Sequence, residues 1–161
     1  MKHFKIFIKS KNMKNYQTIA ALEKSLAASY FLMLKTHSYH WNVVGENFKS
    51  LHELFQVQYE EIFAAIDEIA ERIRALGSKV DGSFSAFEAS LKSHPVKPAN
   101  KDFSAKEMLA DLISDNEALA LQLSGAIKIA QNEEDEVSAD LFIGRAAAHQ
   151  KAVWMLSASK N

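Results

Sequence analysis

The chain has 161 residues, enough for one domain with a substantial hydrophobic core, and 48% of them are hydrophobic and 24% charged, as in soluble globular proteins. It contains no cysteine, which excludes disulfides, thiolate metal sites and thiol catalysis and fits a reducing compartment. The net charge is only −1, no apolar run is long enough to span a membrane, and we expect a cytoplasmic protein without a signal peptide.

The N-terminal stretch is basic. Residues 1–22 carry five of the 19 Lys and Arg residues and none of the 20 Asp and Glu residues, so the rest of the chain is acidic. We interpret residues 1–15 as a flexible arm and residues 16–161 as the folded domain. A basic arm on an acidic body is typical of proteins that bind nucleic acid electrostatically, and a solubilising tail is the alternative. The candidate DNA-binding residues are Lys2, Lys5, Lys9, Lys11 and Lys14.

Apolar residues at helical spacing predict a first helix over about 17–43. Its last turns carry His37, His40 and Trp41. We expect His37 to pack in the core or at an interface rather than to bind a metal, and we expect Trp41, the residue after His40, to have a packing role rather than a chemical one. A short glycine-containing turn then leads to a second helix over about 50–76.

The second helix has two distinct faces. On a helical wheel, one narrow stripe is an ordinary core face, formed by Leu51, Phe55, Ile62, Ile66, Ile69 and Ile73. A second stripe lies about 100° round from the first and consists of His52, Gln56, Tyr59, Phe63 and Asp67, with Glu71 at its edge. This second face is too apolar and aromatic to be simply solvated, so we expect it to meet another chain.

The polar members of the second face are candidate metal ligands, because histidine nitrogen and carboxylate oxygen together suit Fe, Mn or Zn. His52 and Asp67 are about 22 Å apart along the helix, whereas bonds to a metal are about 2 Å long. The two residues therefore cannot share a metal within one chain. Two antiparallel copies of the helix across a two-fold axis solve the problem and form two equivalent sites. Each site would combine two histidines of one subunit with two carboxylates of its partner: His40, His52, Asp67 and Glu71.

Two other arrangements of these residues are compatible with helical spacing. In the first, the acids are solvated and the histidines only pack. In the second, a metal site lies inside the bundle of one chain, but such sites use a Glu-x-x-His motif, and no internal histidine here has Glu three residues before it. We expect His149, near the end of the chain, to be structural.

The rest of the chain predicts one short helix and two long ones. The short helix carries a capping-box pair, Ser85 and Glu88, and a second pair, Ser104 and Glu107, starts a long helix. An acidic turn over 132–136 leads into the last helix. The expected fold is all-α: a four-helix bundle with a short extra helix between the second and third long helices.

Two strings of the chain resemble the Dps family, the DNA-binding proteins from starved cells, which are mini-ferritins of the ferritin-like superfamily. The first, HWNVVGENFKSLH, runs from His40 to His52, and the second, DEIAER, runs from Asp67 to Arg72. The match keeps a fixed spacing and extends over about residues 16–158. The resemblance implies a ferritin-like four-helix bundle that assembles from two-fold dimers into a hollow dodecamer.

The resemblance also implies a function. Such proteins are ferroxidases that oxidise Fe(II), with hydrogen peroxide in preference to dioxygen, and store iron as ferric mineral in the hollow shell. Protection of DNA is implied as well. The alternative is a non-enzymatic protein that compacts DNA independently of sequence and has a vestigial metal site. All four expected ligands are present and the arm is only modestly basic, which favours iron oxidation.

Individual residues take roles from the resemblance. The implied catalytic residues are the iron ligands His40, His52, Asp67 and Glu71, with Trp41 as a nearby electron source. Glu136 and Asp140 match acids that line a pore through which iron enters, although acids at a helix start also favour the helix dipole without any pore. Gln56 stands where the family usually has Asp or Glu, so we expect a second metal to bind weakly there.

Overall fold

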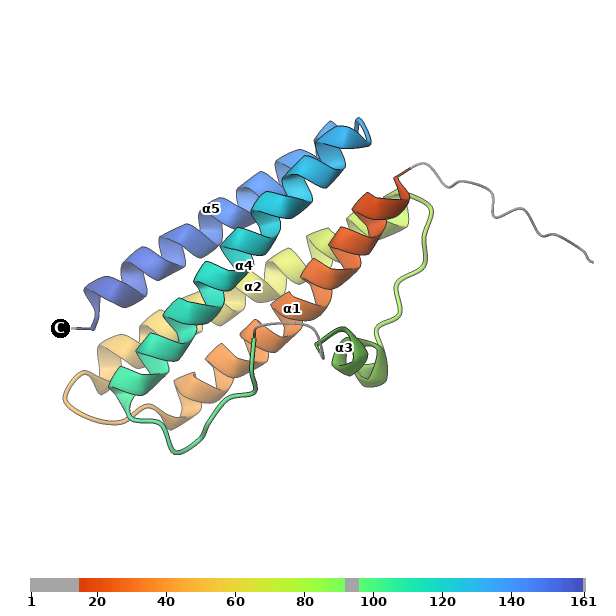
Figure 1. Cartoon of the computed structure of the whole chain (residues 1–161). Coiled ribbons are helices and arrows are strands. Elements are labelled where there is room, and N and C mark those ends of the chain that lie inside the picture. Colours follow the sequence, from red (N-terminus) through yellow and green to blue (C-terminus); the bar gives the residue numbers. More distant parts are fainter. Residues whose placement is uncertain (1–14, 92–95, 161) are drawn as a thin grey trace, which may run out of the picture.

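The computed structural model describes residues 15–91 and 96–160, and within these ranges every regular element is a helix. The helices are α1 (Tyr16–Asn42), α2 (Phe48–Ala75), α3 (Phe84–Leu91), α4 (Ala105–Asn132) and α5 (Glu136–Ala158). The four long helices form a bundle, and the short α3 lies against α1 (Figure 1). The predicted all-α bundle with a short helix in its second connection is confirmed. None of the helices in the described ranges is long and apolar enough to cross a membrane.

Contacts between the long helices divide the bundle into two pairs. α1 packs along α2 and α4 packs along α5, and a short turn joins the two helices of each pair (Figure 1). α1 also packs against α4, whereas α2 approaches α5 over a small area. One long side of α2 is therefore left uncovered by the other helices of its own chain.

The core stripe predicted for the second helix is buried. Its members each keep at most 4% of their surface exposed: Leu51, Phe55, Ile62, Ile66, Ile69 and Ile73. Leu22 and Leu26 of α1 and Leu112 and Leu119 of α4 join them in one hydrophobic core. Burying each such side chain stabilises the fold by about 1.5–3 kcal/mol, so the stripe fixes the rotation of α2 about its axis and thereby the direction of its second face.

The helix starts were predicted correctly in one case and wrongly in another. Ser104 and Glu107 form the predicted capping box, in which each side chain bonds the backbone N–H of the other residue. The Ser85–Glu88 box is wrong. α3 begins two residues earlier than that pair requires, and Ser83 caps it by accepting a hydrogen bond from the backbone N–H of Ala86 at 3.2 Å.

The start of α1 is capped by a residue far away in the sequence. Asn15 precedes the helix with a left-handed backbone (φ 68°) and gives no side-chain cap. The carboxylate of Glu133, in the turn between α4 and α5, instead accepts hydrogen bonds from the backbone N–H groups of Gln17 (3.1 Å) and Thr18 (2.8 Å). A helix start leaves such amides without intrahelical partners, so this contact fixes the start of α1 to the far turn of the bundle.

A buried lysine joins α1 to α4. Lys35 is only 2% exposed, and its Nζ lies 2.8 Å from Oδ2 of Asp111 and 2.6 Å from Oδ2 of Asp115. The hydroxyl of Tyr39 also donates to Oδ2 of Asp111, at 2.6 Å. A buried ammonium needs opposite charge and hydrogen bonds around it, so this cluster specifies how the two helices pack.

Replacing Lys35 by Met should reduce the free energy of unfolding by about 3–5 kcal/mol at pH 7, because two carboxylates lose their buried counter-charge. Burial raises the pKa of Asp115 to about 6 and Lys35 opposes that rise, so the variant raises the pKa further. A carboxyl whose pKa is higher in the folded than in the unfolded chain binds its proton preferentially in the folded state. The loss should therefore shrink as the pH falls.

Urea unfolding at pH 7 and pH 5, at one subunit concentration, measures this difference. Lys24→Met, on an exposed position of the same helix, is the matched control and should change stability little. A loss below about 1 kcal/mol at pH 7, or a loss that is larger at pH 5, would contradict the expected role of Lys35.

Candidate metal centre

The candidate ligands His40 and His52 lie side by side. His40 is in the last turn of α1 and His52 is near the start of α2. The turn between the helices is tight, and Gly45 in it has a φ of 117°, which residues with a side chain rarely adopt. The two imidazole rings are stacked, with centroids 3.7 Å apart and planes inclined by 20°. The chain reversal therefore brings both rings to one end of the helix pair.

Each imidazole is oriented by the backbone of the other histidine. Nδ1 of His40 lies 2.8 Å from the carbonyl oxygen of His52, and Nδ1 of His52 lies 2.8 Å from the carbonyl oxygen of His40. A carbonyl oxygen can only accept, so each Nδ1 carries a proton, and in the neutral imidazole the lone pair is then on Nε2. Histidines that bind metals typically have this kind of orienting hydrogen bond on the other ring nitrogen. The two Nε2 atoms are thus suited to bind a metal ion as neutral ligands.

The candidate acids are not brought to the histidines within one subunit. Asp67 and Glu71 lie one turn apart in the second half of α2, and both are exposed. In the described part of the chain, no three His, Cys, Asp or Glu side chains are close enough together to hold one metal ion. One subunit therefore offers two imidazoles near one end of α2 and two carboxylates near the other end, and a four-ligand set would require a second subunit.

Aromatic rings adjoin the histidine pair. The ring of His37 contacts those of Trp41 and Tyr59, with both centroids 4.1 Å away. Burial, and then repulsion from His40, lowers the pKa of His37, which favours a neutral packing role. Trp41 packs as expected, with its ring inclined by 44° to that of His37, although 60% of its surface remains exposed.

The second face of α2 is largely uncovered in the single chain. Phe63 is 62% exposed, and Asp67 is exposed one turn further along. Gln56 is half-buried, and its Nε2 donates to Oε1 of Glu60 at 2.8 Å. Glu60 was not predicted as a site residue, although its position on the helical wheel lies between those of Asp67 and Glu71.

The acids around the α4–α5 turn fall into two groups. Glu133 caps α1, and Asp135 caps α5 and pairs with Arg72 at 2.6 Å. Glu136 and Asp140 are exposed in the first turns of α5. The favourable placement of acids at a helix start thus accounts for Glu133 and Asp135. The two exposed carboxylates remain the candidates for a pore.

The candidate DNA-binding lysines, which are Lys2, Lys5, Lys9, Lys11 and Lys14, lie outside the described residues. The first described residue is Asn15, and its side-chain amide donates to Asp135 at 3.4 Å. The described part of the chain therefore begins beside the α4–α5 turn.

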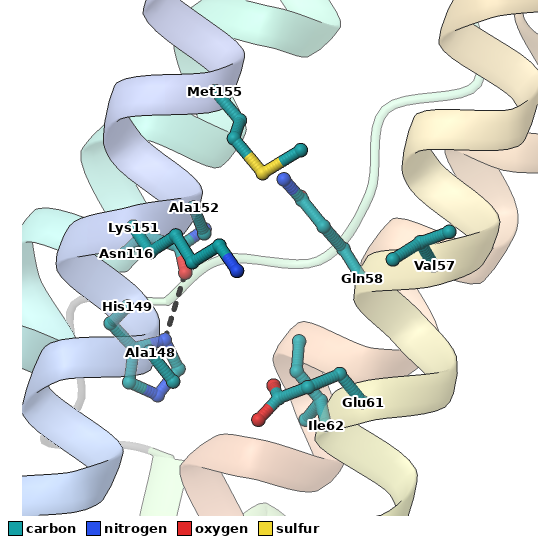
Figure 2. Close-up of a pocket in the computed structure, with 10 residues that line it drawn as sticks. All are labelled: Val57, Gln58, Glu61, Ile62, Asn116, Ala148, His149, Lys151, Ala152 and Met155. Carbon is teal, nitrogen blue, oxygen red and sulfur yellow. Dashed lines mark hydrogen bonds between the residues drawn. The ribbon is translucent and has the colours of Figure 1, made fainter.

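A cavity of about 260 Å³ opens between α2 and α5, on a side of α2 that faces away from the histidine pair (Figure 2). On its wall, Nδ1 of His149 is 2.8 Å from Oδ1 of Asn116, and Glu61 is paired with Arg145. Burial, together with Arg145, lowers the pKa of His149 to about 3, so this histidine stays neutral. His149 is structural, as predicted, and this cavity is not a candidate metal centre.

Sequence comparison relates the whole domain to known proteins. The model of the ferritin-like domain matches residues 19–159. The chain is 40% identical over 141 residues to a low temperature-induced protein of Nostoc sp. The aligned residues cover 86% of this chain and 76% of that protein. It is 36% identical over 147 residues to DNA protection during starvation protein 2 of Bacillus anthracis. The aligned residues cover 91% of this chain and 99% of that protein.

Solved structures give the same relationship. Dps from Staphylococcus aureus has a TM-score of 0.84 at 36% identity, over 92% of this chain and 98% of that one. A Dps protein from Vibrio cholerae, described as a member of a broad superfamily of ferritin-like diiron-carboxylate proteins, has a TM-score of 0.83 at 28% identity, over 92% and 91% of the two chains. Because sequence and fold agree over nearly the entire domain, the chain belongs to the Dps family of ferritin-like proteins.

Proposed function

We propose that this protein is a ferroxidase and iron store whose active site forms between two subunits. Fe(II) is the substrate, and it binds to two histidines of one subunit and two acids of the partner, which are His40, His52, Asp67 and Glu71. The observation that carries the proposal is the orientation of the histidine pair, since backbone hydrogen bonds leave both Nε2 lone pairs available side by side.

The length of α2 supports the two-subunit arrangement. When His52 stands opposite the segment between Asp67 and Glu71 of an antiparallel partner, the two-fold axis passes near the middle of the helix, at about residue 60. The exposed ring of Phe63 lies close to that point and becomes buried in the dimer. Two equivalent sites then form at the two ends of one helix–helix contact.

The donor set explains the chemistry. Two neutral imidazoles and two carboxylates balance the charge of one Fe(II) and leave coordination positions open for the oxidant. The oxidant is hydrogen peroxide or dioxygen. One peroxide takes one electron from each of two Fe(II) ions and, with two protons, yields two water molecules and two Fe(III) ions. Trp41, whose ring contacts that of His37 near the site, supplies an electron when only one Fe(II) is at hand.

Storage follows from assembly. The ferric product mineralises inside a hollow homo-oligomer, a dodecamer built from two-fold dimers, in the cytoplasm. Glu136 and Asp140 line the pores through which iron enters, because exposed carboxylates concentrate Fe(II) at the surface. Membership of the Dps family supports this role, as does the description of the Vibrio cholerae relative as a diiron-carboxylate protein.

Protection of DNA is a second function, favoured by the basic arm. The Bacillus anthracis relative is named for DNA protection during starvation. The five arm lysines per chain, multiplied over an oligomer, bind DNA phosphates without reading sequence. The alternative, a protein that only compacts DNA around a vestigial metal site, accounts for the arm but not for the orientation of the two Nε2 atoms.

Mixing His52→Ala subunits with Asp67→Ala subunits should restore ferroxidase activity. In a mixed dimer, one of the two sites receives wild-type His52 from one subunit and wild-type Asp67 from the other. Half of randomly formed dimers are mixed, so about a quarter of all sites are intact. Iron oxidation measured after dissociation and reassembly of a 1:1 mixture should therefore reach about a quarter of the wild-type rate.

The matched control is a mixture of His52→Ala with His40→Ala subunits. Both histidines of a site come from one subunit, so no mixed dimer of this kind contains an intact site, and activity should stay at the level of the single variants. Equal activity in the two mixtures would refute the cross-subunit site.

Replacing Gln56 by Glu should tighten the binding of a second Fe(II) at each site. One Fe(II) with two neutral histidines and two carboxylates is formally neutral, and a second Fe(II) leaves a charge of about +2 in a partly buried site, which is costly. A carboxylate at position 56 lowers that charge to about +1. Anaerobic calorimetry should detect one tight and one weak Fe(II) per wild-type site, and roughly tenfold tighter binding of the second Fe(II) in the variant.

Gln150→Glu, at an exposed position of α5, adds the same charge away from the histidine pair and should leave both affinities unchanged. Two equally tight irons in the wild type, unaffected by Gln56→Glu, would show that position 56 does not limit the second metal.

Deleting residues 1–14 should abolish DNA binding at low salt. Binding by the full-length protein should be independent of sequence, and five phosphate contacts should lose roughly two to three orders of magnitude in affinity between 50 and 200 mM salt. Gel-shift titrations with two unrelated duplexes measure both properties.

A variant that removes five exposed lysines of the folded domain is the control for total charge: Lys97, Lys101, Lys106, Lys128 and Lys151, each replaced by Gln. It should bind DNA nearly as well as the wild type. If the truncated protein still shifts DNA and the five-lysine variant does not, the binding element is the surface of the bundle instead of the arm.

A further inference from the structure

Gln56 donates a hydrogen bond to the carboxylate of Glu60. That carboxylate can supply the negative charge that an Asp or Glu at position 56 would carry. The hydrogen bond runs from Nε2 of Gln56 to Oε1 of Glu60 and is 2.8 Å long. A carboxylate oxygen only accepts hydrogen bonds, so the amide nitrogen of Gln56 must face Glu60 and the amide oxygen, Oε1, must face away from it. This hydrogen bond therefore decides which end of the amide is presented to its surroundings.

Glu60 belongs to the face of α2 that carries the candidate ligands. Measured from His52 on the helical wheel, Glu60 lies about 80° round, between Asp67 at about 60° and Glu71 at about 100°. Side chains of a helix lean toward its N-terminus, and the bond to Gln56 holds the Glu60 carboxylate over the preceding turn. The negative charge of Glu60 is thus drawn toward the end of α2 that carries His52.

No basic residue in the described ranges of its own chain neutralises the negative charge of Glu60, so this charge can act on the face that carries His52. In the single chain the residue is exposed, and none of the ion pairs among the described residues involves it. The adjacent acid, Glu61, differs in both respects. It points toward α5, where both of its carboxylate oxygens bind the guanidinium of Arg145. Of the two consecutive acids, only Glu60 can act on the face that carries His52.

We propose that Glu60 is a positioning residue for the second Fe(II): it turns Oε1 of Gln56 toward that ion and supplies the negative charge that position 56 lacks. This inference rests on the proposed function. The second metal then has a neutral amide oxygen as ligand and a carboxylate about one helical turn, or roughly 5–6 Å, further along α2. At that distance and in a partly solvated site, one unit charge changes the affinity for a divalent ion about tenfold.

The test is a titration of the full-length oligomer with Co(II), a divalent probe that is not oxidised under these conditions, followed by calorimetry and by the visible absorption of bound Co(II). In Glu60→Gln, the second Co(II) should bind about tenfold more weakly while the first is unchanged, because the charge is lost and the amide is no longer oriented. The double variant Gln56→Glu/Glu60→Gln, which moves the charge by one turn, should bind the second Co(II) at least as tightly as the wild type.

Glu117→Gln, which removes an exposed carboxylate of α4, is the matched control and should change neither affinity. An unchanged second affinity in Glu60→Gln overturns the inference, as does an equal loss for both ions or a double variant that stays as weak as Glu60→Gln. If the wild type binds no Co(II) at all, the proposed metal site itself fails. Tight binding of the first ion with no effect of Glu60 rejects the role of Glu60 alone.

Discussion

A helix fixes the distance between its residues, and this constraint governs how α2 can take part in a metal site. Its buried stripe, anchored in the core by residues such as Phe55 and Ile73, prevents the helix from rotating to move its polar face. His52 and Asp67 therefore stay about 22 Å apart in one chain. The same rigidity lets two subunits form the site together. When two straight helices pack antiparallel across a two-fold axis, the His52 end of each lies beside the Asp67 end of the other.

Long-range polar contacts hold the frame that presents this helix. Glu133 ties the start of α1 to the α4–α5 turn, and Lys35 ties the middle of α1 to α4. α1 in turn packs along α2 and carries His40 at its end. The position of the histidine pair thus depends on polar interactions at two other levels of the bundle. Hydrogen bonds and ion pairs require particular partners in a particular orientation, whereas hydrophobic packing alone does not.

Local patterns allowed the fold to be predicted from the sequence because helical periodicity reports burial directly. The stripe from Leu51 to Ile73 and the Ser104 capping box needed only neighbouring residues. The burial of Lys35 could not be predicted, since its partners lie on a distant helix. The cap of α3 was misplaced because several serines compete at that position and only the backbone decides among them. For the candidate site, spacing predicted which residues share a face, whereas ring stacking, imidazole tautomers and the Gln56–Glu60 bond required coordinates.

The hydrogen bonds of the histidine pair have an evolutionary consequence. Each ring is held by a backbone carbonyl, and every amino acid at position 40 or 52 supplies that carbonyl. A mutation of one histidine therefore removes one imidazole but leaves the acceptor that fixes the tautomer of the other. The two positions can drift one at a time, and a lineage that has lost one imidazole keeps the second in a geometry from which a single reversion restores the pair.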